Sequence, residues 1–219
     1  MKLDELFEQL QKSVVEGDPE RSSSYTVLLL EKGVDPLTII DQALVPGIQF
    51  TGKQFSDGEM FLPDLMLASE AMQASLKLCN PELHRRGLSR KSLGRVVLGT
   101  ISGDIHEIGK NLVGTLLSAN GFEVFDLGVN VPVETFTQKA LELKADLVGV
   151  SALLTTTMEG QRKVIEAIER ANLRPAVKVI IGGAPVTDGW AKEIRADGYS
   201  EDAISAVTLA KRLLNIPLL

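Results

Sequence analysis

The second half of the chain alternates between two hydrophobic patterns, and this alternation limits the fold more than any other feature. Apolar runs of strand length are separated by stretches with the spacing of amphipathic helices. Strands are expected at about 95–100, 122–126, 146–151 and 177–182, helices at about 107–120, 132–143, 157–172 and 186–196, and a short fifth strand near Gly198–Tyr199 with a last helix at 201–214. Such alternation predicts a five-stranded, doubly wound parallel α/β sheet at residues 94–219.

The first part of the chain shows helical patterns alone. A helix is expected at residues 3–16, and the pairs Asp18-Pro19 and Asp35-Pro36 are typical helix starts, with Asp as the cap and Pro in the first turn. The third helix is expected to bend near Pro46-Gly47, and a fourth helix follows Pro63. Four helices with short connections predict an antiparallel four-helix bundle.

The bundle is predicted to occupy residues 1–84, and the polar, basic segment 85–93 is predicted to be a linker. The net charge of −6 and the lack of a basic stripe argue against a nucleic-acid partner. Cys79, the single cysteine, cannot form an internal disulfide, and the charged start does not resemble a signal peptide. No apolar run is long enough to span a membrane, so we expect a cytoplasmic protein.

The loop after the first expected strand, residues 103–109, combines residues suited to ligand binding. Open α/β sheets bind ligands at this place, beyond the carboxyl ends of the strands. Asp104 and His106 are two residues apart, so in an extended loop their side chains point the same way. Asp104 can then hold one ring nitrogen of His106 and leave the other free for a metal. Gly109 lets a bulky group approach the backbone, and the alternative for Asp104 is a plain helix N-cap.

Two other expected strands end in residues that belong to the same edge of the sheet. The third strand ends at Ser151, and three threonines follow it at 155–157. The fourth strand ends in Gly182-Gly183, which permits close approach to the backbone. Alternatives stay open, because Thr155 or Thr157 can cap a helix and a glycine pair can form a simple turn.

Three pieces, Asp104-x-His106-x-x-Gly109, Ser151-x-Leu153 and Gly182-Gly183, together resemble the cobalamin-binding signature. Over almost its whole length the chain is similar to the small corrinoid proteins of methyltransferase systems and to the cobalamin module of cobalamin-dependent methionine synthase. The resemblance implies a helical bundle cap and a flavodoxin-like, Rossmann-type cobalamin-binding domain. It also implies the strand order 2-1-3-4-5.

The resemblance implies specific roles for these residues. His106 would replace the cofactor's own dimethylbenzimidazole as the lower ligand of cobalt, Asp104 would accept a hydrogen bond from its other ring nitrogen, and Thr157 would extend this relay. The further cofactor contacts would be Met60, Phe61, Gly103, Ile105, Glu107, Ile108, Gly109, Ser151, Leu153, Thr155, Gly182, Gly183, Tyr199 and Ser200. Met60 and Phe61 belong to a segment, 58–63, that resembles the family's cover over the upper corrin face; its alternative reading is bundle core.

The function implied by the resemblance is methyl transport. A carrier subunit without catalytic activity of its own would alternate between cob(I)alamin and methylcob(III)alamin. It would take a methyl group from a donor-specific methyltransferase and pass it to a second methyltransferase with a tetrahydrofolate or thiol acceptor, with a reductive activase as a further partner. Two alternatives stay open: a cobalamin-dependent sensor or regulator, and the cobalamin subunit of an adenosylcobalamin mutase. The sequence does not identify the methyl donor.

Overall fold

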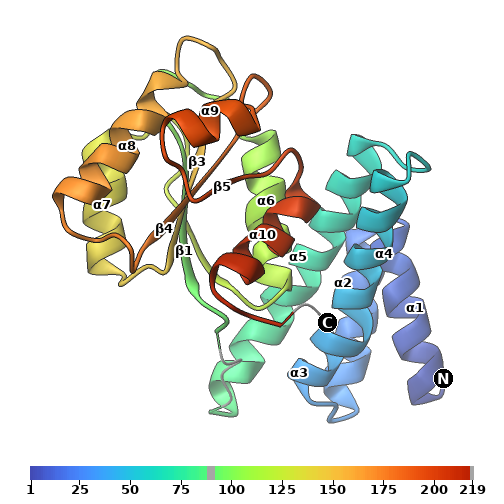
Figure 1. Cartoon of the computed structure of the whole chain (residues 1–219). Coiled ribbons are helices and arrows are strands. Elements are labelled where there is room, and N and C mark those ends of the chain that lie inside the picture. The colour runs from blue at the N-terminus through green and yellow to red at the C-terminus, as the bar shows by residue number, and fades with distance from the viewer. Residues whose placement is uncertain (88–91, 218–219) are drawn as a thin grey trace. The chain divides into compact units, whose positions relative to one another are not determined.

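The chain divides into two compact units, Met1–Lys91 and Ser92–Leu219, in a computed structural model that describes residues 1–87 and 92–217 (Figure 1). The last helix of the first unit extends to Arg85, one residue into the segment predicted as a linker. Residues 88–91 of that segment, and residues 218–219 of the predicted second domain, lie outside the described residues. The exact domain and linker bounds therefore stay a prediction.

The first unit is a bundle of helices, as predicted. Its elements are α1 (Leu3–Val15), α2 (Pro19–Glu31), α3 (Pro36–Ile39), the π-helix η1 (Ile40–Leu44), α4 (Val45–Ser56) and α5 (Leu62–Arg85). Both predicted caps are present, because the Asp18 carboxylate accepts from the N–H of Arg21 and that of Asp35 accepts from the N–H of Leu37. The buried faces of α1, α2, α4 and α5 form the core of this unit.

The third helix is irregular one turn before the predicted bend. Residues Ile40–Leu44 form a π-helix, in which the N–H of Val45 bonds to the Ile40 carbonyl instead of the carbonyl four residues back. Pro46 follows directly and has no N–H to continue the regular ladder. A widened turn lets the helix continue past the proline, so the chain needs no sharp break there.

The second unit is a parallel sheet with helices on both faces. Its strands are β1 (Arg95–Thr100), β2 (Glu123–Asp126), β3 (Leu147–Ser151), β4 (Lys178–Gly182) and β5 (Gly198–Tyr199), and its helices are α6 (Ile108–Ala119), α7 (Val133–Glu142), α8 (Glu159–Arg170), α9 (Asp188–Glu193) and α10 (Ala203–Leu213). The strand order is β2-β1-β3-β4-β5, and every pair is parallel. This confirms both the doubly wound fold and its predicted strand order.

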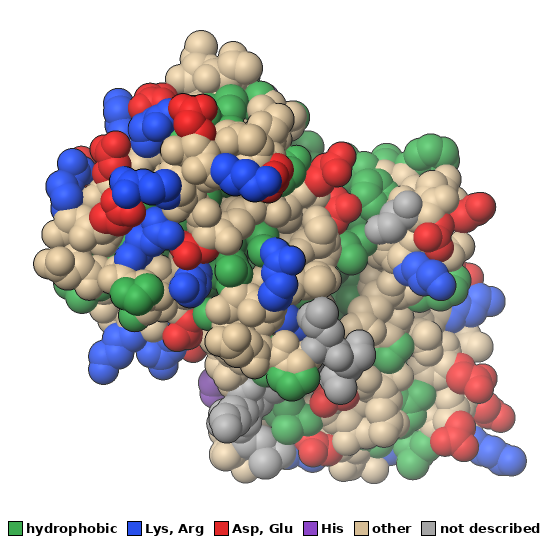
Figure 2. All heavy atoms as spheres, viewed as in Figure 1, with side chains coloured by type: hydrophobic (Ala, Val, Ile, Leu, Met, Phe, Trp, Pro, Cys, Tyr) green, Lys and Arg blue, Asp and Glu red, His purple; other side chains and the backbone are tan. Residues whose placement is uncertain are grey.

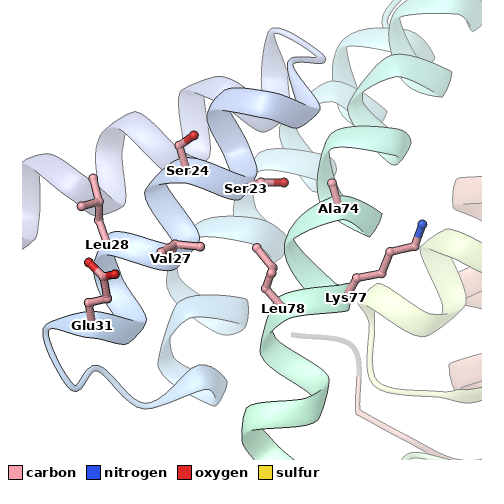
Figure 3. A pocket seen from close by; sticks show the side chains of 8 residues that line it. All are labelled: Ser23, Ser24, Val27, Leu28, Glu31, Ala74, Lys77 and Leu78. Carbon is pink, nitrogen blue, oxygen red and sulfur yellow. The ribbon is translucent and has the colours of Figure 1, made fainter.

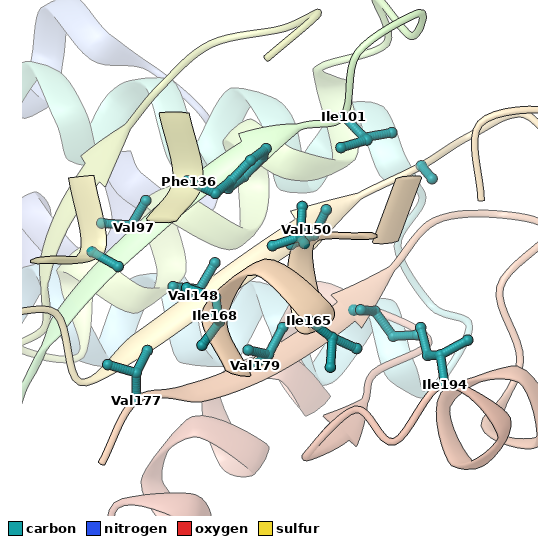
Figure 4. Close-up of a cluster of buried hydrophobic side chains, with 14 of the residues drawn as sticks. Val97, Ile101, Phe136, Val148, Val150, Ile165, Ile168, Val177, Val179 and Ile194 are labelled. Carbon is teal, nitrogen blue, oxygen red and sulfur yellow. The ribbon is translucent and has the colours of Figure 1, made fainter. Parts of the chain in front are cut away.

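The central strands are apolar because helices cover both of their faces. α6 and α10 pack together on one face, and α7, α8 and α9 lie on the other (Figure 1). Figure 4 shows the core on the second side, where Phe136 of α7 and Ile168 of α8 contact the buried valines of β1 and β3. The strands thus form a rigid platform for the loops at their carboxyl ends.

Three helices, α8, α9 and α10, begin two residues later than predicted, and the first two of them change the loops after β3 and β4. α8 starts at Glu159, because Thr155–Met158 form turns after β3 instead of a first helical turn. α9 starts at Asp188, where the Thr187 hydroxyl caps the helix by accepting from the N–H of Trp190. In both places polar residues at the strand end stay in the loop, which lengthens the loops at the carboxyl edge of the sheet.

Lys and Arg side chains are interspersed with Asp and Glu on the face of the molecule that Figure 2 displays. Among the helices formed by residues 1–87 and 92–217, none has the length and apolar content needed to cross a bilayer.

Candidate functional site

The carboxyl ends of β1, β3 and β4 bring the three signature pieces to one edge of the sheet. Thr100, at the end of β1, is in register with Ser151 on β3, and Ser151 is in register with Gly182 on β4. The loop 101–107 follows β1 and is hydrogen-bonded to the loop that follows β3. Residues separated by about fifty positions in the sequence therefore share one site.

Asp104 and His106 form a direct contact in this loop. The Asp104 Oδ1 atom lies 2.7 Å from His106 Nδ1 and also accepts from the backbone N–H of His106 at 3.0 Å. The two side chains thus point the same way, as the spacing predicted. The contact assigns the proton-bearing ring nitrogen to Nδ1 when the imidazole is neutral.

The second carboxylate oxygen of Asp104 is held by the loop after β3. Its Oδ2 atom accepts from the backbone N–H groups of Leu153 at 2.6 Å and Leu154 at 3.2 Å, and from the Thr157 hydroxyl at 3.0 Å. Asp104 is fully buried. It does not cap α6, which begins four residues later with Glu107 in the cap position, and so the alternative reading of Asp104 is wrong.

These contacts determine the charge of Asp104. Burial raises the pKa of the carboxyl group, but the hydrogen bonds from the His106 N–H and ring, from Leu153 and from Thr157 outweigh it and lower the pKa from 3.8 to about 2. Asp104 is therefore an anion at neutral pH. A buried anion at Nδ1 makes the imidazole a stronger donor through its other nitrogen.

The His106 side chain is half-exposed, and exposed apolar residues are its neighbours in the sequence. Its side chain is 47% exposed, and within the described residues its Nε2 atom has no hydrogen-bond partner. Ile105 and Ile108 beside it are 75% and 55% exposed, which is unusual for isoleucine. A half-exposed imidazole beside exposed apolar residues fits a broad, flat group that carries a metal and fills the other coordination positions itself.

Gly183 and Gly109 differ in what a side chain at each position would contact. A Cβ at Gly183, where φ is +128°, would lie 1.9 Å from the Ala152 carbonyl oxygen, so packing within the chain already requires this glycine. Gly109 lies in the first turn of α6, and a Cβ there would meet nothing within 4 Å. The protein itself gives no steric reason for glycine at 109, which fits a bound group that covers this turn.

The remaining predicted contacts line the edge formed by β3, β4 and β5. Ser151, Gly182, Tyr199 and Ser200 are partly buried, whereas Thr155 is exposed. Burial raises the pKa of the Tyr199 phenol, and nearby carboxylates add to the rise. Tyr199 is therefore neutral at physiological pH and can donate a hydrogen bond.

Thr157 is not the N-cap of α8, which was the alternative role considered for it. Its hydroxyl is within hydrogen-bond distance of both Asp104 Oδ2 and the Leu154 carbonyl, and α8 has no side-chain cap. Because a hydroxyl has a single proton, it donates to one of these acceptors at a time.

Sequence reasoning missed two residues that hold this loop. The Thr100 hydroxyl donates to the His106 carbonyl at 2.9 Å. Asn130, in the loop between β2 and α7, accepts from the N–H of Gly103 at 2.8 Å. The available signal for Asn130 was its position after a strand in Gly-Val-Asn-Val-Pro, where asparagine favours a turn.

Sequence reasoning also missed Gln161, which links the ends of β3 and β4. Gln161, on α8, is fully buried and donates its amide protons to the carbonyls of Val150 and Gly182, which joins the ends of β3 and β4. Its amide oxygen accepts from the Trp190 indole at 3.0 Å. No motif in the sequence indicated this role, because the partners lie on three different elements.

In the bundle unit, the predicted contacts Met60 and Phe61 lie in the turn before α5. Phe61 is 71% exposed, whereas Met60 is partly buried. An open groove of about 750 Å³ lies elsewhere on this unit, between α2 and α5, with Val27, Leu28 and Leu78 in its lining (Figure 3). The groove contains neither predicted contact.

Comparisons with known proteins agree with this geometry. Residues 94–208 match a family model described as a B12 binding domain, and residues 6–80 match a second model with the same description. Together the two matches cover both units.

Three relatives illustrate the similarity. The trimethylamine corrinoid protein 2 of Methanosarcina acetivorans is 44% identical over 208 residues, which cover 95% of this chain and 96% of that protein. A dimethylamine corrinoid protein of the same organism is 42% identical over 214 residues, or 96% and 97% of the two chains. A chain in the crystal structure of the methanol:cobalamin methyltransferase complex from Methanosarcina barkeri is 30% identical and superposes with a TM-score of 0.84, covering 98% of this chain and 81% of that one. The chain therefore belongs to the corrinoid proteins of methyltransferase systems, whose cofactor is cobalamin.

Proposed function

We propose that His106 is the lower axial ligand of cobalt and that this chain carries methyl groups between two methyltransferases. The observation that supports the proposal is the buried carboxylate of Asp104 on His106 Nδ1, which leaves Nε2 for a metal on a half-exposed side chain in the segment that also carries the exposed Ile105 and Ile108. When bound, cobalamin supplies a cobalt centre that can accept and release a methyl group. The protein supplies the ligand and the surroundings of that centre.

Asp104 keeps the proton on Nδ1, which leaves the Nε2 lone pair for the metal. The donors from the loop after β3 keep Asp104 ionised and fixed in position. The imidazole is thereby oriented before the cofactor arrives, and little conformational freedom is lost on binding. The Thr157 hydroxyl is the outer end of this relay and can stabilise the carboxylate when the imidazole moves away.

The remaining predicted contacts have two different tasks. Residues 103–109 would lie against the lower corrin face, while Ser151, Leu153, Thr155, Gly182, Gly183, Tyr199 and Ser200 would line the space for the nucleotide tail that His106 displaces. Met60 and Phe61 of the bundle unit would cover the upper face and exclude water there. The large exposed area of Phe61 supports this task, because a bound macrocycle would bury it.

The partners proposed for the chain are a donor-specific methyltransferase, a second methyltransferase with a tetrahydrofolate or thiol acceptor, and a reductive activase. The names of the two methylamine relatives make methylated amines the first donor class to test. Trimethylamine, dimethylamine and methanol should each be supplied with its own methyltransferase and the cobalamin-loaded chain. Methylation of the bound cofactor from one donor alone would identify the partner, and its absence with every pair would refute the carrier function.

The ligand assignment can be tested by electron paramagnetic resonance, because the chain has just two histidines. The protein is labelled with ¹⁵N-histidine and loaded with unlabelled cobalamin in the cobalt(II) form. A histidine ligand gives a nitrogen doublet, whereas the cofactor's own base gives a triplet. We expect a doublet, its loss in His106→Ala and its retention in His84→Ala, where the exposed His84 serves as the matched control. A triplet in the labelled wild-type protein would refute the assignment.

A further inference from the structure

We propose that Asn130 is a positioning residue for His106: it holds the backbone that carries the imidazole in the conformation that binds cobalt. The inference rests on the proposed function, because it gives Asn130 a purpose only if His106 is a ligand. Asn130 lies outside all three pieces of the cobalamin signature.

Asn130 contacts the residues that precede His106 through both its side chain and its backbone. The Asn130 Oδ1 atom accepts from the N–H of Gly103 at 2.8 Å and from the Ser102 hydroxyl at 3.2 Å. The backbone N–H of Asn130 donates to the carbonyl of Asp104 at 2.9 Å. One residue thus holds three consecutive residues of the loop, on the side opposite to the donors that hold the Asp104 carboxylate.

The two loops are joined on either side of Asn130 as well. The N–H of Thr100 donates to the Gly128 carbonyl at 3.0 Å, and the N–H of Val131 donates to the Thr100 carbonyl at 2.9 Å. Ile101 and Val131 form an isolated parallel bridge. The Asn130 side chain is exposed, but the backbone that carries it is fixed to the end of β1 by these contacts.

The conformation of residue 130 explains why asparagine occupies it. Its φ is +53°, in the left-handed region that glycine, asparagine and aspartate tolerate best. Glycine would allow this backbone but has no side-chain acceptor for the Gly103 N–H. Aspartate would allow the backbone and retain an acceptor. Position 130 thus requires both a left-handed backbone and a side-chain acceptor. Glycine meets the first requirement alone, whereas aspartate meets both.

Loss of the Oδ1 contacts leaves the Asp104–His106 hydrogen bond in place but releases the backbone before it. A smaller fraction of molecules then presents the imidazole correctly, and the apparent affinity for cobalamin falls by the same factor. One lost backbone hydrogen bond corresponds to a factor of about three to ten.

The test compares Asn130→Gly with Asn130→Asp in the full chain. Amide hydrogen exchange at Gly103 is measured by NMR without cofactor, and the dissociation constant for hydroxocobalamin is measured by absorbance. Asn130→Gly should accelerate the exchange and weaken binding about three- to tenfold, whereas Asn130→Asp should stay within about twofold of wild type. Equal behaviour of the glycine variant and the wild type, or of the two variants, would overturn the inference.

A third variant separates positioning of His106 from general loosening of the loop. In a His106→Ala background, Asn130→Gly should still accelerate Gly103 exchange but should no longer change hydroxocobalamin binding. The same loss of affinity in both backgrounds would show that Asn130 does not act through the imidazole. If His106→Ala alone leaves the ¹⁵N doublet intact, the proposed function fails and this inference fails with it. If the doublet is lost but Asn130→Gly binds hydroxocobalamin as tightly as the wild type does, this inference fails and the proposed function stands.

Discussion

Replacing Asp104 with asparagine tests the arrangement on which the site depends. The two carboxylate oxygens accept from five donors: the N–H and ring of His106 on one side, and two N–H groups and the Thr157 hydroxyl on the other. An asparagine amide has a single acceptor oxygen, so its NH₂ group must face donors on one side. At least one buried N–H then loses its partner.

Asp104→Asn is expected to lower the free energy of unfolding by about 2–4 kcal/mol. An unsatisfied buried group costs roughly 1–3 kcal/mol, and hydrogen bonds to a charged group are stronger than those between neutral groups. The shift in the pKa of Asp104 has the same hydrogen bonds as its cause and gives a similar magnitude. A fall from 3.8 to about 2 corresponds to roughly 2 kcal/mol between the ionised and protonated forms. Both values are large for a single substitution outside the apolar core.

Urea denaturation of the cofactor-free protein, followed by tryptophan fluorescence, is the appropriate assay. Trp190 is the single tryptophan in the sequence and lies in the α/β unit, so the signal reports that unit rather than the bundle. With a slope of about 1.5–2 kcal/mol per molar, we expect the midpoint to fall by about 1–2.7 M.

Glu123→Gln is the matched carboxylate-to-amide control, because Glu123 forms a half-exposed ion pair with Arg95. This control should change stability by less than about 1 kcal/mol. A midpoint for Asp104→Asn within about 0.3 M of wild type, at an unchanged slope, would mean that the carboxylate does not hold the two loops together.

The same geometry predicts the outcome of four further experiments. Gly183→Ala should destabilise the cofactor-free protein by more than about 2 kcal/mol in urea denaturation, because its Cβ would overlap the Ala152 carbonyl. Gly109→Ala should stabilise the cofactor-free protein slightly but weaken hydroxocobalamin binding about tenfold. Binding equal to that of the wild type would contradict a bound group over α6. Thr157→Val should cost about 1–2 kcal/mol through the lost hydrogen bond to Asp104, and Thr157→Ser should restore most of it in the same assay. The depressed pKa of Asp104 stabilises the fold above about pH 4, and this contribution should disappear as the pH falls toward 2; Asp104→Asn should lack this acid-dependent loss in denaturation curves recorded over that range.

Local patterns were sufficient for the elements of this fold. The change from helical spacing to strand–helix alternation predicted the two types of unit, and the Asp-Pro pairs predicted two helix starts that the structure confirms. The bend at Pro46 was predicted one turn away from the π-helix that accommodates it, because the missing N–H acts on the preceding turn. The helix expected from about residue 157 begins at Glu159, because a threonine run suits a turn and a helix cap equally well.

Periodicity within short segments was enough to predict the parallel sheet, the loop that carries His106 and the shared direction of Asp104 and His106. The contacts that hold that pair come from other parts of the folded chain. The Asp104 carboxylate is fixed by donors 49 to 53 residues away, and the backbone at Gly103 is fixed by Asn130, 27 residues away. Such partners are chosen by which strand ends lie side by side in the folded sheet, and no pattern along a single segment contains that information.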